Sequence, residues 1–253
     1  MTASQVRYQV RLLTRTPRTI YSAFLLPALL VVALSLAGSK SSGQQVGVAV
    51  GIAAFAIVST AYATHATGLV AARDRGVLRR LRGTPLLPAA YFAGRITATV
   101  LLATAAAAGA FIVAQAILGI RIPSAAIPGL LVTSVMGALC WASLGTAATR
   151  LVPEPEAAWA ILSASYLPLV FISGVFFPTS AEPSWLASVA RWLPMQPMVQ
   201  ALGTALQPNT SLPQLDLRSM GVLAAWAAVG LVVALKTFAW ERRPARKRKP
   251  GHG

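Results

Sequence analysis

Cysteine and acidic residues are scarce in this sequence. Cys140 is the only cysteine among 253 residues, so no intrachain disulfide can form and no metal site can be built from cysteines. The acidic residues all lie at or beyond the ends of apolar runs. They are Asp74, Glu154, Glu156, Glu182, Asp216 and Glu241. If these runs cross a membrane, the distribution argues against an ion-coupled carrier, which is expected to keep carboxylates at mid-membrane.

Motifs for nucleotide binding and for serine catalysis are also missing. The nearest sequence to a Gly-Lys-Ser/Thr phosphate loop is Gly38-Ser39-Lys40-Ser41, which lacks the glycine before the lysine. A serine hydrolase needs an activated serine near a histidine, and His65 is the only histidine away from the tail. Ser173-Gly174 lacks the flanking glycine of a nucleophile elbow. We therefore predict no catalytic, cofactor-binding or metal-ligating residues in this chain.

Apolar residues dominate the sequence. Hydrophobic residues make up 56% of it and charged residues only 11%, with a mean hydropathy of +0.65, whereas a soluble domain carries about a quarter charged residues. A bilayer span needs about 20 apolar residues. Six runs are long enough to span, and they cover residues 20–37, 46–72, 86–120, 125–149, 157–177 and 219–240. The sequence therefore predicts an all-α integral membrane protein with six transmembrane helices in residues 20–240.

Basic residues set the predicted orientation. Of the 22 Lys and Arg residues, only Lys40, Arg121, Arg191 and Arg218 lie in the first, third and fifth connections; the other eighteen lie near the termini or the second and fourth connections. Both termini are therefore predicted to be cytoplasmic, which requires an even number of spans. The basic clusters flank apolar runs, so topology explains the net charge of +16 without nucleic acid as a partner.

Two basic segments flank this membrane domain. In residues 1–19, the four arginines Arg7, Arg11, Arg15 and Arg18 share one helical face, as expected for an interfacial helix on the cytoplasmic leaflet. Flanking charge without a regular helix is the alternative. At the other end, residues 241–253 form a basic cytoplasmic tail that we expect to lie near anionic lipid.

The second connection, at about residues 73–84, has a helical pattern. Val77, Leu78 and Leu81 share one face, and Gly83 and Pro85 end the helix. A short amphipathic helix of this kind suits docking on a partner. A basic loop that fixes topology is the alternative, although it would need no ordered leucines.

The fifth connection, at about residues 178–215, is neither polar enough for a free loop nor apolar enough for a simple span. Apolar residues recur in it at helical spacing and prolines interrupt it. We expect short helices that dip into the outer leaflet, anchored at the membrane interface by Trp185 and Trp192.

Two stretches carry more specific motifs. Residues 73–86 contain Asp74, Gly76, a Leu-x-x-Leu pair and Thr84-Pro85-Leu86. Residues 167–178 contain Pro168, Ser173-Gly174 and Phe176-Phe177-Pro178, and the pattern continues to Trp192-Leu193-Pro194. Both resemble motifs of the permease subunit of type-2 ATP-binding-cassette exporters, a family that includes bacterial drug, lipid and polysaccharide efflux permeases. The second stretch is the more specific.

The resemblance implies an architecture and a set of partners. The fold would have an interfacial helix, six spans, a cytoplasmic coupling helix and re-entrant extracellular helices. Two permeases, as a homodimer or heterodimer, would bind two ATPase subunits that hold ATP and Mg. The coupling residues would be Asp74, Gly76, Val77, Leu78, Leu81 and Thr84. The substrate path would include Phe55, Tyr62, Phe171, Phe176 and Phe177. Family members often have Glu where this chain has Asp74.

The resulting prediction is a permease subunit that moves a hydrophobic or amphipathic substrate outward by alternating access. A non-transporting membrane anchor or sensor is the alternative, and an ion-coupled carrier comes third. The frequent Ala and Arg are typical of a high-GC bacterium, so we expect the bacterial cell membrane. His65 could line a polar path or hydrogen-bond between helices. Glu154 and Glu156 flank Pro155 at the start of the fifth span, where carboxylates interact favourably with the helix dipole. Contact with a substrate or the ATPase is the alternative.

Overall fold

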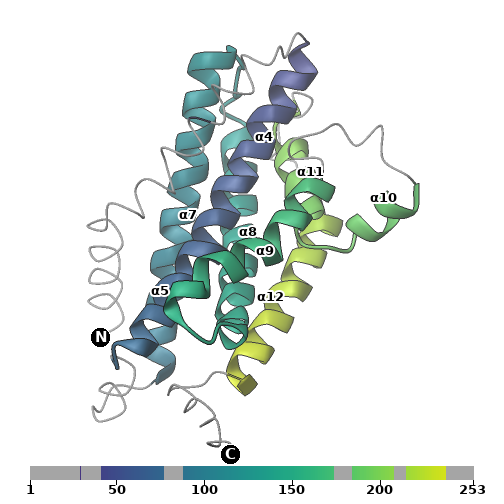
Figure 1. Ribbon diagram of the computed structural model, residues 1–253. Coiled ribbons are helices and arrows are strands. Elements are labelled where there is room, and N and C mark those ends of the chain that lie inside the picture. Colours follow the sequence, from purple (N-terminus) through teal and green to yellow (C-terminus); the bar gives the residue numbers. More distant parts are fainter. Residues whose placement is uncertain (1–28, 30–40, 77–87, 174–183, 208–214, 238–253) are drawn as a thin grey trace, which may run out of the picture.

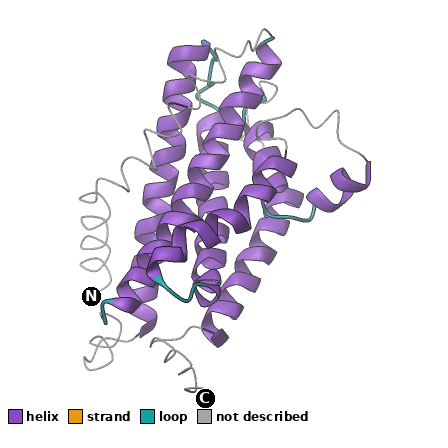
Figure 2. Ribbon diagram, viewed as in Figure 1, coloured by secondary structure: helices purple, strands orange, loops and turns teal. Residues whose placement is uncertain are grey.

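The computed structural model describes residue 29 and residues 41–76, 88–173, 184–207 and 215–237. These residues form helices and the turns between them, with no strand in the described ranges (Figure 2). The long helices lie side by side as one bundle (Figure 1). The all-α prediction is therefore confirmed for the described part of the chain.

The second expected span is one long helical unit with a change of pitch in the middle. It consists of α4 (Ser42–Val58), a π-helical segment η2 (Ser59–Thr64) and α5 (His65–Asp74). Ser41 begins α4 with a capping box, because its hydroxyl accepts from the Gln44 backbone N–H and the Gln44 side chain accepts from the Ser41 N–H, each at 3.3 Å. The unit Ser42–Asp74 has 33 residues and exceeds the length that a bilayer needs.

Four further helices have the length and composition of membrane spans. They are α7 (Pro88–Leu118), α8 (Ala126–Ala148), which continues into the 3-10 turn η3 (Thr149–Leu151), α9 (Pro155–Ile172) and α12 (Leu217–Thr237). Together with Ser42–Asp74 they are five candidate membrane-spanning helices, which match the second to sixth expected spans in position. The first, at 20–37, lies outside the described residues, so the total of six stays a prediction.

Small residues let the helices approach closely around α8, which packs against α4, α5, α7, α11 and α12. Ala53, Ala138 and Ala142 are fully buried. Gly230 of α12 lies so close to α8 that a Cβ atom there would come within 2.8 Å of the Leu144 backbone nitrogen. This packing of backbone against backbone is usual between helices in a membrane. No hydrophobic driving force acts between helices in lipid, so association relies on the close van der Waals packing that small side chains allow.

Two short helices lie in the expected fifth connection, α10 (Ser184–Ala190) and α11 (Met195–Ala205). Their presence agrees with the helical spacing read from the sequence, and Pro194 separates them. The side chains of Met195, Met198 and Leu202 are fully buried, and α11 packs against α4, α8 and α12. This helix is therefore part of the bundle core, which its interrupted pattern did not indicate. Its depth in a membrane stays a prediction.

Several predictions fall outside the described residues. They are the interfacial helix at 1–19 with Arg7, Arg11, Arg15 and Arg18, the tail at 241–253, the coupling residues Val77, Leu78, Leu81 and Thr84, and the substrate-path residues Phe176 and Phe177.

Candidate functional site

An aromatic junction joins three of the spans. The Tyr62 ring of η2 meets the Trp141 ring of α8 edge-on at a centroid distance of 5.6 Å, and the Tyr166 ring of α9 at 5.9 Å. Phe55 of α4 lies 6.4 Å from Tyr166. All four side chains are buried. Edge-to-face and tilted contacts at these distances are favourable, so the junction holds α4, α8 and α9 together.

A hydrogen bond crosses the same junction. The Ser165 hydroxyl donates its hydrogen to the Leu162 carbonyl at 2.6 Å, so it accepts from the Tyr62 hydroxyl, 2.8 Å away. The close approach of α8 to this point depends on Gly145, since a Cβ there would lie 3.0 Å from the Tyr62 carbonyl oxygen. Tyr62 itself lies in the π-helical segment, a local geometry that is rare and often found at functional sites.

The predicted substrate-path residues are only partly brought together. Phe55 and Tyr62 both lie in the buried junction, on the second span as predicted. Phe171 is 52% exposed on α9. The sequence reasoning missed Tyr166 and Trp141, which complete the junction; both are aromatic residues within apolar runs, and that signal was available. The role of these residues in a substrate path stays a prediction.

A buried polar cluster surrounds His65 at the start of α5. The Thr146 hydroxyl donates its hydrogen to the Ala142 carbonyl at 2.8 Å, so it accepts from Nε2 of His65 at 3.0 Å. The Thr99 hydroxyl then donates to Nδ1 of the neutral ring at 2.8 Å. Both ring nitrogens are satisfied without a positive charge. His65 therefore bridges α7 and α8, as in the interhelical interpretation.

Arg95 of α7 completes this cluster. Its side chain is only 4% exposed. One terminal nitrogen lies 3.4 Å from the His65 carbonyl oxygen and the other lies 3.5 Å from the Tyr91 hydroxyl. Gly68 leaves room for the guanidinium, because a Cβ at that position would come within 2.6 Å of Nη2. The charge distribution alone places Arg95 among the basic residues that set topology, although a basic residue inside an apolar run is also a signal for an interior role.

The end of α5 is tied to the end of η3. Arg73 donates to the carbonyl oxygens of Thr149 at 3.3 Å and Val152 at 2.7 Å, and the Thr149 carbonyl also accepts from the Val152 backbone N–H at 3.3 Å. Asp74 is the last residue of α5, and Gly76 follows with a φ of 67°, in the left-handed region that glycine favours after a helix. The expected coupling segment at 73–84 therefore begins within α5, and Asp74 does not start a separate helix.

The predicted interface and acidic residues have clear positions. Trp185 and Trp192 are 67% and 65% exposed, as an interfacial role requires, and the Trp192 carbonyl accepts from Nε1 of Trp226 at 2.7 Å. Glu154 immediately precedes α9, which begins at Pro155, and Glu156 lies in its first turn. That placement fits the helix-dipole interpretation of the two carboxylates.

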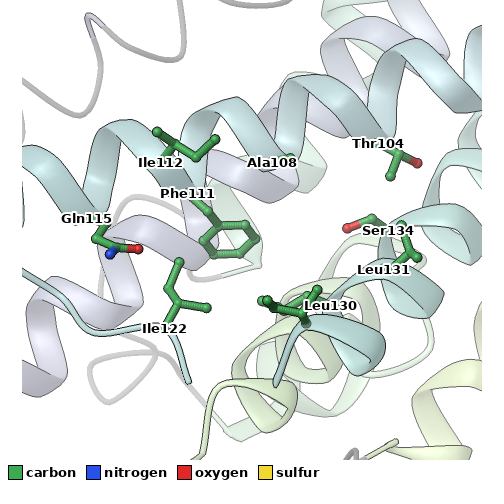
Figure 3. A pocket seen from close by; sticks show the side chains of 10 residues that line it. Thr104, Ala108, Phe111, Ile112, Gln115, Ile122, Leu130, Leu131 and Ser134 are labelled. Carbon is green, nitrogen blue, oxygen red and sulfur yellow. The ribbon is translucent and has the colours of Figure 1, made fainter. Parts of the chain in front are cut away.

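A cavity of about 310 Å³ lies between α7 and α8, away from the polar cluster. Figure 3 shows Phe111 and Ile122 beside it, and Ser134 facing it from α8. Thr104, whose buried hydroxyl has no hydrogen-bond partner in the part of the chain that the structure describes, also lines it. None of the described substrate-path residues lines this cavity.

The sequence matches the model of the ABC-2 type transporter family over residues 4–206, which is more than half of the chain. The chain belongs to the ABC-2 type transporter family. A search of curated protein sequences found no match. Membership makes this multi-pass membrane protein the permease component of an ABC transporter and explains the apolar spans. The family works with an ATPase, and the permease is a transport component that is not itself catalytic.

Proposed function

We propose that this chain is the permease subunit of an ATP-driven exporter in the bacterial cytoplasmic membrane. Two permease copies, identical or related, assemble with two ATPase subunits that hold ATP and Mg. By alternating access, the complex moves a hydrophobic or amphipathic substrate outward, such as a drug, a lipid or a lipid-linked molecule. The observation that carries the proposal is the family match over residues 4–206. The sequence contains no phosphate loop, which supports a separate ATPase.

The aromatic junction supports a substrate path beside α4 and α9. Its rings offer apolar surface with a few hydroxyl groups, the usual lining of a site for an amphipathic molecule. In the proposed mechanism α4 and α9 separate as the complex changes state, which uncovers Phe55 and Tyr62. Phe171, already exposed on α9, lines the same path.

In the proposed mechanism, the segment that follows α5 couples the permease to the ATPase. In the proposed mechanism Val77, Leu78 and Leu81 insert into a groove on the ATPase, and Asp74, Gly76 and Thr84 set the ends of this segment. Movement of the ATPase would then act directly on α5. Because Arg73 binds the carbonyls of Thr149 and Val152, the same movement would also reach η3 and α8.

The proposal is tested by co-expressing the chain with an ATPase of the same genome and purifying the complex through a tag on the permease. Leu78→Asp would place an unpaired charge in the apolar contact, which should cost several kcal/mol. It should reduce ATPase recovery at least tenfold. Arg80→Ala is the matched control in the same segment, because it lies off the apolar face, and it should keep most of the recovery.

Equal membrane insertion of both variants is checked first. For this, Ser211→Cys or Ser4→Cys is introduced into each variant, and the cysteine is labelled with an impermeant reagent in intact cells. Wild-type recovery with Leu78→Asp would exclude this segment as the coupling contact. If no ATPase binds the wild-type chain, the exporter proposal is wrong and a membrane anchor or sensor is favoured.

A further inference from the structure

Arg95 is a buried cation at a shallow depth in the bundle. It is the eighth residue of α7, so its Cα lies roughly 10 Å along the helix from Pro88, at about 1.5 Å per residue. It is also four residues after Tyr91, where the apolar span begins. The basic residues predict the cytoplasmic side for this end of α7. Since α7 has 31 residues, more than the roughly 20 that a bilayer span needs, we expect Arg95 to lie near the level of lipid head groups.

The guanidinium has far fewer partners than it can take. An arginine side chain has five N–H donors. Nε of Arg95 is buried without a hydrogen-bond partner among the described residues, and the bonds to His65 and Tyr91 are long, at 3.4 and 3.5 Å. Both acceptors are neutral oxygens. The neighbouring His65 ring, a neutral or cationic group, supplies no negative charge, and its two nitrogens are hydrogen-bonded to Thr99 and Thr146.

No carboxylate described in the structure neutralises Arg95. The chain has six acidic residues, and residues 1–73 contain none of them. Four of the six lie in described ranges, namely Asp74, Glu154, Glu156 and Asp216, and Arg95 makes no ion pair with any of these four. A buried cation without a counter-charge is strongly unfavourable, and in membrane proteins such residues generally pair or mark a binding site.

We propose that Arg95 binds the oxyanion of an amphiphile, a phosphate or carboxylate head group that reaches it from the adjacent membrane leaflet. Tyr91 donates a second hydrogen bond to the same oxyanion, and Gly68 provides the space in which the guanidinium lies. The planar guanidinium is suited to bidentate contact with such a group. The site does not depend on export, since a resident lipid would occupy it equally well.

The test measures thermal unfolding of the full-length chain in nanodiscs of phosphatidylglycerol or of digalactosyldiacylglycerol, a neutral lipid without phosphate or carboxylate. The anionic lipid should raise the wild-type Tm by about 5 °C or more relative to the galactolipid. Arg95→Gln should lose this difference. In the galactolipid it should melt at the wild-type temperature or above, because the substitution removes an uncompensated charge. Inorganic phosphate added to galactolipid discs distinguishes a free anion from a lipid head group and should have no effect.

Arg75→Gln is the control, since Arg75 is exposed at the end of α5 on the same side of the bundle. It should keep the lipid preference. Gly68→Ala keeps the charge and displaces the guanidinium, so it should reduce the preference even if Arg95→Gln fails to fold. An unchanged preference in Arg95→Gln or Gly68→Ala would overturn the proposal, as would equal losses in Arg75→Gln and Arg95→Gln. If Arg95→Gln lowered the Tm equally in both lipids, the partner of Arg95 would be a carboxylate of the protein. That result would also overturn the proposal.

Discussion

Removing either hydroxyl of the Tyr62–Ser165 hydrogen bond should loosen α9 from η2, and the two removals should differ. Ser165→Ala leaves the buried Tyr62 O–H without an acceptor, which costs about 1–3 kcal/mol. Tyr62→Phe should cost less, about 0.5–1.5 kcal/mol, because the Ser165 hydrogen still has the Leu162 carbonyl at 2.6 Å. The coupling energy of the pair should be about 0.6 kcal/mol, the average of such cycles in one membrane protein, in which the largest value is about 1.7.

The assay is unfolding of the wild type, both single variants and the double variant by sodium dodecyl sulfate in mixed micelles. The four free energies of unfolding form a double-mutant cycle that isolates the pair from the aromatic contacts of the Tyr62 ring. The reasoning would be refuted by a coupling energy within about 0.3 kcal/mol of zero. A larger cost for Tyr62→Phe than for Ser165→Ala would refute the assignment of Tyr62 as the donor.

Two further predictions concern α12. Gly230→Ala should be less stable than Gly221→Ala by about 1–3 kcal/mol. The methyl group at position 230 would meet the α8 backbone, whereas a methyl group at position 221 meets nothing within 4 Å. Equal free energies of unfolding for the two variants would contradict the close packing. At Asp216, burial raises the carboxyl pKa, but hydrogen bonds from Ser219, a backbone hydrogen bond from Arg218 and the Arg218 charge together outweigh it, so the pKa lies below its usual value. Its contribution to stability is therefore present above about pH 4 and lost as the pH falls further, and Asp216→Asn should flatten that acid limb in a pH series of unfolding curves.

Spans and their order could be predicted because apolar length is a property of the sequence alone. The runs at 46–72, 125–149 and 157–177 correspond to helices in the structure. The sequence could not predict the π-helical segment Ser59–Thr64, because a local change of pitch depends on tertiary packing, and this segment packs closely against α8 at Gly145. The burial of α11 was missed for a similar reason, since Pro194 and its neighbours suggested an interrupted segment at the interface.

The candidate site was less predictable than the spans. The family resemblance predicts Phe55 and Tyr62 as substrate-path residues. The structure shows that they meet Tyr166 and Trp141 in a buried junction. Periodicity does not show which residues of different helices face one another. Arg95 shows the same limit: its charge is visible in the sequence, whereas its burial beside His65 comes only from the packing of α5 on α7.

The most direct test of the central claim is transport by the reconstituted complex. The chain and its ATPase are placed in proteoliposomes, and uptake of fluorescent amphiphiles is measured in the inside-out orientation. The account predicts uptake that needs both chains and hydrolysable ATP, and ATP hydrolysis that the transported compound stimulates. Uptake driven by an ion gradient without the ATPase, or no ATP-dependent uptake across a panel of drugs and lipids, would contradict it.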